Sequence, residues 1–149
     1  TAVAQQSSPS QQAETSRMLV NDLPEACRAA GASMTPDMQS MRAQGQKQMQ
    51  SMSVMVAKMG QTQRALSEAM MKMEPAMMQG TMAQDPDLGW ACSMIPHHQG
   101  ALDMSRAVLS RGKEPEIKKM AEKTIRVQEK DIAELKEWIE KKSPGGAKM

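Results

Sequence analysis

The sequence predicts an all-α protein: a four-helix bundle, ferritin-like in outline, with an extra short helix at the N-terminus. A capping position, a proline and an acidic residue follow one another at Thr35-Pro36-Asp37, Asp85-Pro86-Asp87 and Glu114-Pro115-Glu116, which is typical of helix starts. Apolar residues recur between these signals with the 3.6-residue period of a helix, and no segment alternates as a strand does. The length of 149 residues fits one domain with its own core.

The N-terminal part is expected to carry one short helix. Residues 1–15 are mostly Gln, Ser, Ala and Thr with little to bury, and we interpret them as a disordered arm. Asp22 can then cap a short helix that Gly31 ends. The bundle domain is predicted to cover residues 16–142, and residues 143–149 are predicted to form a flexible tail.

The central region is expected to be helical and rich in methionine. A second helix should run from Pro36 to about Lys58, with Gly60 as its stop. A third segment, 61 to about 83, contains Pro75, at which it can bend. The sequence leaves open whether these segments form one broken helix or a hairpin.

Two long helices are expected in the C-terminal half. The fourth helix begins at the Asp85 signal, carries both histidines and ends at Arg111-Gly112. The last helix begins at the Glu114 signal and ends before Pro144. Its apolar stripe follows the helical period through Ile117, Ala121, Ile125, Gln128, Ile132, Leu135 and Ile139.

Methionine is the most informative residue type, because the chain has 18 methionines and neither Phe nor Tyr. Thioether sulfur is neutral and polarizable, and it suits the soft monovalent ions Cu(I) and Ag(I). Methionine also fills helical cores. On the second helix one stripe comprises Met34, Met38, Met41, Met52, Met55 and Met59, with Met49 beside it, and we expect most of these to be core. The third segment carries a second methionine seam about 100° further round the helix, which a core does not require. Candidate ligands, many of them three or four residues apart, are Met38, Met41, Met49, Met52, Met55, Met59, Met70, Met73 and Met77.

The histidine segment is more specific. His97 and His98 are adjacent, Met94 precedes them by one helical turn, and Met104 follows His97 by two turns. Imidazole is a good copper ligand, so the segment predicts a Cu(I) site, with help from a methionine on another helix. The alternative is a core His98 with a satisfied hydrogen bond and a surface His97.

A ligating imidazole usually donates its other N–H to an acceptor that orients it. Gln128 is a polar residue on the apolar stripe of the last helix, and Asp131 lies one turn further on. We expect these two residues to orient the histidines. The alternative is that they form a structural link between helices.

Cys27 and Cys92 form an even pair in a chain with no other cysteine. Such a pair would form one disulfide in an oxidising compartment, linking the short first helix to the start of the histidine helix. The rival interpretation is a pair of copper-binding thiolates. We favour the disulfide.

Several classes of function are not expected. The net charge is only +2, and the alternating Lys and Glu of the last third indicate a solvated helix face, so nucleic acid is not an expected partner. The sequence contains no run of about 18 apolar residues, so it predicts no transmembrane helix. The Glu-x-x-His, HExxH and Gly-rich phosphate motifs are missing from the sequence, and catalysis is not expected.

Three segments together resemble a known family. Met94-x-x-His97-His98-Gln99, the preceding Asp85-Pro86-Asp87 and the later Gln128-x-x-Asp131 are similar to the signature of small secreted helical proteins of unknown function built around M-x-x-H-H. The resemblance covers about residues 85–140. With the methionine-rich helices upstream, it implies a ferritin-like bundle, export to the periplasm, and binding of Cu(I) and Ag(I) in copper resistance. The implied partners are a copper efflux system or a copper-sensing protein.

The sequence therefore predicts a non-enzymatic, periplasmic or secreted Cu(I)-binding protein that sequesters copper or hands it on. The start at Thr1 without Met fits an exported chain whose signal peptide has been removed, and it fits a chain cut for other reasons. The alternative function is a methionine-rich helical module that binds an amphipathic peptide or a partner protein without metal.

Overall fold

The computed structural model describes residues 20–30 and 35–143, and these residues contain no strand. The all-α prediction is therefore confirmed. The expected arm over residues 1–15, Gly31 and most of the C-terminal tail lie outside the described residues. The helices, in chain order, are α2 (Glu25–Ala30), α3 (Pro36–Val56), α4 (Gln61–Gly80), α5 (Pro86–Arg111) and α6 (Pro115–Lys142).

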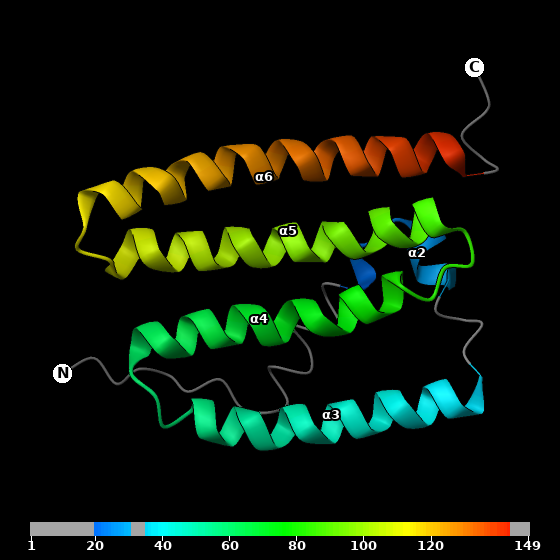
Figure 1. Ribbon diagram of the computed structural model, residues 1–149, viewed down its shortest axis with the longest axis horizontal. Helices are drawn as coiled ribbons and strands as arrows, with labels where there is room; N and C mark the ends of the chain where they lie inside the picture. The colour runs from blue at the N-terminus through cyan, green and yellow to red at the C-terminus, as the bar shows by residue number, and fades with distance from the viewer. Residues whose placement is uncertain (1–19, 31–34, 144–149) are drawn as a thin grey trace.

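The four long helices lie side by side and antiparallel, in the order α3, α4, α5, α6 (Figure 1). Most of the interhelical packing joins α4 to α5 and α5 to α6, whereas α3 packs more loosely on α4. Residues 36 to 80 are therefore a helical hairpin, which answers the question that the sequence left open. No helix of the described residues has the length and apolar character needed to cross a membrane.

The predicted capping signals are present at the starts of α3 and α5. The hydroxyl of Thr35 accepts a hydrogen bond from the Met38 amide at 3.4 Å. The Asp85 carboxylate accepts from the amides of Asp87 and Leu88 at 2.9 and 3.0 Å. These bonds satisfy amides that have no partner within the helix, and so they fix where each helix begins.

The short helix α2 begins later than predicted, and Asp22 does not cap it. The carbonyl of Pro24 accepts from the amides of Cys27 and Arg28 at 2.9 and 3.2 Å, so the helix begins at Glu25. Asp22 lies in the preceding turn. Proline suits the start of a helix, because its fixed φ matches the first turn and it has no N–H to leave unpaired.

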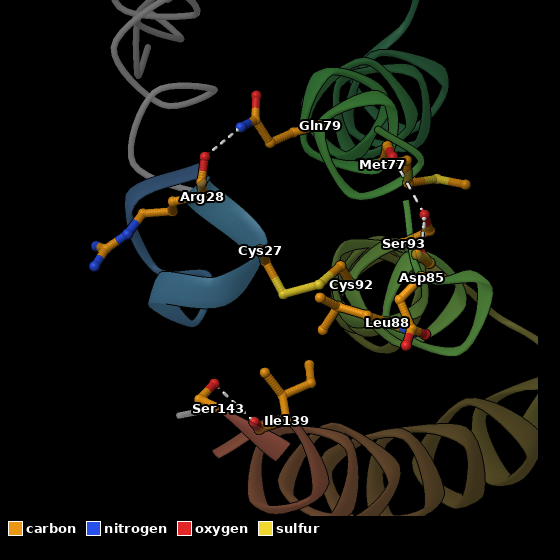
Figure 2. The surroundings of a disulfide bond; sticks show 11 residues. Cys27, Arg28, Met77, Gln79, Asp85, Leu88, Cys92, Ser93, Ile139 and Ser143 are labelled. Atoms are coloured by element: carbon orange, nitrogen blue, oxygen red, sulfur yellow. Dashed lines mark hydrogen bonds between the residues drawn. A yellow bond between two sulfur atoms is a disulfide. The ribbon is translucent and has the colours of Figure 1, made fainter. Parts of the chain in front are cut away.

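The core lies where α2, α4, α5 and α6 meet, and the Cys27–Cys92 disulfide is at its centre (Figure 2). The two Cα atoms are 5.4 Å apart across 65 residues of sequence, and both cysteines are fully buried. The predicted disulfide is confirmed, and it links α2 to the first half of α5. The described residues include no free cysteine, which removes the thiolate alternative. The core residues are Leu23, Cys27, Ala76, Ala91, Cys92, Ile95 and Ile139.

The expectation that most methionines of α3 are core was wrong. Met41 is 66% exposed and Met55 is 62% exposed, and the only buried side chains on α3 are Ser53 and Val56. The physical reason is that, among the described helices, α3 packs mainly and loosely on α4, so these helices leave most of its circumference uncovered. Met34, which the same stripe included, lies outside the described residues.

The crossing of α4 and α5 gives a first prediction. Replacing Gly80 with alanine should lower the free energy of unfolding by about 1–3 kcal/mol, the usual range for overpacking. A Cβ at this position would lie 2.6 Å from the backbone carbonyl carbon of Cys92 and from the amide nitrogen of Ser93, and backbone cannot swing aside. Urea denaturation measures the change.

The control is Gly45→Ala in α3, because a Cβ at Gly45 meets nothing within 4 Å. This variant should be as stable as the wild type or more stable by up to about 1 kcal/mol, since alanine favours a helix interior. Equal stabilities of Gly80→Ala and Gly45→Ala would contradict the close approach of α4 and α5.

Candidate metal centre

Helix α2 covers one side of the layer formed by α4, α5 and α6, where Cys27 is bonded to Cys92 (Figure 2). On α5, the positions of Met94, His97 and Met104 lie about 120–160° round the helix from Cys92. These residues therefore lie on the side of the layer that α2 does not cover. His97 is exposed, and the two methionines are half-buried.

Helix α4 turns methionines to the same side. Figure 2 shows the Met77 side chain pointing away from α2, whereas Gln79 points toward α2 and donates from Nε2 to the Arg28 carbonyl at 2.9 Å. Met70 and Met73 share the side of Met77 because they precede it by seven and four residues. We call this side the methionine–histidine face. It comprises Met70, Met73 and Met77 of α4 with Met94, His97 and Met104 of α5.

Met73 is a methionine of α4 that the structure brings against the histidine helix. A Cβ placed on Gly100 would overlap the Met73 sulfur, and the Cβ and Cγ of Met73 would lie 3.3 Å from it. Gly100 is one turn after His97 and one turn before Met104. The Met73 thioether therefore lies against α5 between two candidate ligands, and it can approach only because residue 100 has no side chain.

The methionines of α3 form a separate set. Their helix packs on α4, so they are not brought to the histidine segment of α5. Met52 is exposed, as is Met59 in the bend after α3, and Met38 and Met49 are half-buried. Methionines spaced three or four residues apart along α3 can still offer two sulfurs to one ion, but they lie far from the imidazole rings.

His98 points to the other neighbour of α5, helix α6. It lines an open recess of about 630 Å³ between α5 and α6, and its Nδ1 is buried with no hydrogen-bond partner in the described part of the chain. The centroid of its ring is 5.8 Å from that of His97, with the rings inclined at 68°. The residues that line the recess are Asp87, Trp90, Ala91, His98, Asp131, Glu134, Leu135 and Trp138.

The surroundings of His98 favour its neutral form. Burial lowers the pKa of His98, the Asp131 carboxylate opposes this change, and the nearby His97 adds to it. A neutral imidazole has a free lone pair on one nitrogen, which is the form that binds a metal. Asp131 thus lies near His98, as expected. Its role as an orienting carboxylate stays a prediction, because Nδ1 of His98 has no hydrogen-bond partner among the described residues. Gln128 is half-buried on α6, and it does not line the recess.

The ligand set of this face is soft. Within residues 20–30 and 35–143, no three His, Cys, Asp or Glu side chains come together as a metal site. A metal held here would depend on methionine sulfur with imidazole, and that combination selects a soft ion over calcium, magnesium or zinc. The described part of the chain offers this combination where α4 meets α5.

Sequence reasoning missed one residue near the site, Trp90. It lines the recess together with His98 and is 61% exposed, which is unusual for the largest apolar side chain. A signal was available, because Trp90 precedes His97 and His98 by about two helical turns and so lies near both along α5.

Comparison with known proteins adds a family and no activity. No curated protein matches the chain. A family profile matches residues 1–139, which is nearly the whole sequence and includes both the methionine-rich hairpin and the histidine helix. The chain belongs to the family described as Domain of unknown function (DUF305).

Proposed function

We propose that this protein binds Cu(I) and Ag(I) at the methionine–histidine face, and that it sequesters the ion or hands it on without catalysing a reaction. The observation that carries the proposal is the position of Met73 against Gly100. It brings a thioether from α4 to the turn of α5 between His97 and Met104. Thioether and imidazole from two helices are a donor set for a soft monovalent ion.

The fold is well suited to a cargo ion. The core around the disulfide lies toward the α2 side and uses none of the proposed ligands, so the bundle closes without metal. The proposed ligands are half-buried or exposed, which allows an ion to enter and leave from solvent. Copper is then a bound substrate and not a folding ligand.

The disulfide supports a periplasmic or extracellular location, because disulfides persist in oxidising compartments. The methionine-rich hairpin followed by the histidine helix also resembles CopM, a cyanobacterial periplasmic copper-binding protein. That resemblance implies a role in copper resistance, with a copper efflux system or a copper-sensing protein as the partner that receives the ion.

A second candidate function is a methionine-rich surface that binds an amphipathic peptide or partner protein without metal. The exposed methionines of α3 favour it, since unbranched, polarizable side chains adapt to different apolar partners. The two functions differ in their response to Cu(I): the copper-binding function requires that the protein bind this ion, and the peptide-binding function does not.

The direct test is a titration of the full chain with Cu(I) against a chromogenic Cu(I) chelator. Ascorbate keeps the copper reduced, and the buried disulfide stays intact. A copper-binding protein should saturate at a small whole number of ions and compete likewise for Ag(I), but not for Mg(II). Failure to withdraw Cu(I) from the chelator would leave the peptide-binding function as the better account.

The variant Gly100→Ala tests the geometry of the site. The new Cβ must displace the Met73 sulfur, which is the flexible end of a side chain, so the fold should tolerate it and helix propensity should favour it. Cu(I) affinity should fall about 10- to 100-fold, the range found when the surroundings of a metal ligand are disturbed. Unchanged affinity in a variant with unchanged stability would exclude Met73 as a ligand.

A further inference from the structure

Both tryptophans of the protein lie in one place, the recess between α5 and α6. Trp90 comes from the start of α5 and Trp138 from the end of α6, 48 positions later, and the chain has no Phe or Tyr. Trp90 is 61% exposed, whereas Trp138 is partly buried against the core. Two indole rings therefore line one recess at the surface, and the core does not account for the exposure of Trp90.

The recess is negatively charged in a protein whose net charge is +2. Its lining includes the carboxylates of Asp87, Asp131 and Glu134, and none of the described residues that line it is Lys or Arg. Among the described residues, neither Asp87 nor Asp131 takes part in an ion pair. Glu134 pairs with Lys130 at 3.4 Å, but both side chains are more than 60% exposed, so the pairing is weak.

One of the two indole rings, that of Trp138, already contacts a cation. The Lys142 ammonium lies 5.6 Å from the centroid of the Trp138 ring, within the range of a cation–π interaction. Ala91 and Leu135 complete the lining with apolar surface. The recess therefore combines indole faces, apolar contacts and carboxylates, and the ligand that matches all three is a cation with an apolar surface.

We propose that the recess between α5 and α6 binds a methylated ammonium group. Such a group spreads its charge over methyls that pack on indole and aliphatic side chains, and the carboxylates balance the charge without forming hydrogen bonds. A primary ammonium is strongly hydrated and needs hydrogen-bond acceptors, so it fits less well. The proposal does not require copper to be bound, but His98 lines the recess and is also a predicted copper ligand, so the titrations use copper-free protein.

Titration of the copper-free full chain with choline tests the proposal. Because the two tryptophans are the only ones in the chain, their fluorescence reports on the recess alone. The control ligand is 3,3-dimethyl-1-butanol, which has the shape of choline without its charge. Choline should produce a saturable change and bind at least about tenfold more tightly than the alcohol, as a partly desolvated cation–π contact predicts. Equal binding of the two compounds, or of choline and ethanolamine, would overturn the proposal.

Variants locate the site. Trp90→Ala should weaken choline binding about tenfold, and Glu134→Gln should weaken it several-fold at low salt because a nearby opposite charge is lost. The matched control is Glu129→Gln, on the same helix, where the carboxylate is also exposed and also pairs with a basic residue, but does not line the recess. It should bind as the wild type does. An equal loss in both glutamine variants would show that net charge, and not the recess, attracts the cation.

Lys142→Gln should raise the affinity for choline, whereas Trp90→Ala and Glu134→Gln should lower it. Its ammonium contacts the Trp138 ring and competes for the same surface, so its removal should tighten choline binding by a few-fold. Isothermal calorimetry can measure this change without relying on fluorescence. Weaker binding in Lys142→Gln would contradict a cation site at this ring.

Discussion

Replacing Cys27 and Cys92 together with alanine should lower the free energy of unfolding by about 4 kcal/mol, the value that the chain-entropy relation gives for a loop of this length. The disulfide closes a loop across 65 positions of sequence at the centre of the core, where Ile139 and Ala76 also pack. A typical domain has about 5–15 kcal/mol in total. This loss is therefore a large part of the stability, and denaturant unfolding should show it directly.

Alanine is the suitable replacement because serine would bury two hydroxyl groups beside Ile139. A reducing agent should lower the stability of the wild type by a similar amount and should leave the double variant unchanged. The loss should be greatest around α2, since a six-residue helix is not stable on its own, and hydrogen exchange of its amides can show this. A change below about 1 kcal/mol, well under the usual range for a native disulfide, would mean that the remaining contacts of α2, such as the Gln79 bond to Arg28, suffice to hold it.

Helix starts could be predicted from the sequence because they depend on local chemistry. The capping side chains Thr35 and Asp85 bond to amides within three residues of themselves, and a proline follows each. The start of α2 was missed because two local signals competed. Asp22 offered a side-chain cap, but Pro24 fixed the backbone at the first turn, and its carbonyl receives the first helical bonds.

The exposure of the methionines on α3 could not be predicted in the same way. A 3.6-residue period determines which residues share a face, but it does not determine which neighbour covers that face. Met41 and Met55 lie on such a stripe, yet α4 is the described helix on which α3 mainly packs, and both methionines stay exposed. Burial depends on contacts between distant parts of the chain, and nothing in the local sequence specifies them.

The sequence could predict which candidate ligands share one helix, but not which residues of another helix lie beside them. The spacing of Met94, His97 and His98 follows from helical geometry, whereas the approach of Met73 to α5 depends on the missing side chain of Gly100. Gln128 was expected beside the histidines because it is polar on an apolar stripe. The structure places Asp131, and not Gln128, in the recess with His98. The residues of α6 that line the recess lie round the helix from its apolar stripe, by slightly less than the 100° that separates successive residues.

The histidine pair should give Cu(I) binding a characteristic dependence on pH. An imidazole must be neutral to bind metal, and an ordinary one is protonated below a pH of about 6.5. His98 faces the recess between α5 and α6 and not the methionine–histidine face, so copper held by His98 would lie apart from Met73. Burial lowers the pKa of His98, so protons should displace that copper only at a pH clearly below this value. Thioether sulfur has no proton to exchange, and sites made of methionine alone should not change. The wild type should therefore lose part of its affinity as the pH falls, and keep the remainder.

The variants His98→Ala and His97→Ala separate the contributions of the two rings. His98→Ala should remove the part of the binding that is lost at the lower pH, and the double variant should bind Cu(I) with no dependence on imidazole protonation. Chelator competition between pH 5 and 8 measures both, with circular dichroism of each variant as the control for folding. If the double variant keeps the stoichiometry, affinity and pH dependence of the wild type, the histidines are structural. The methionine pairs of α3 and α4 would then be the sites that bind copper.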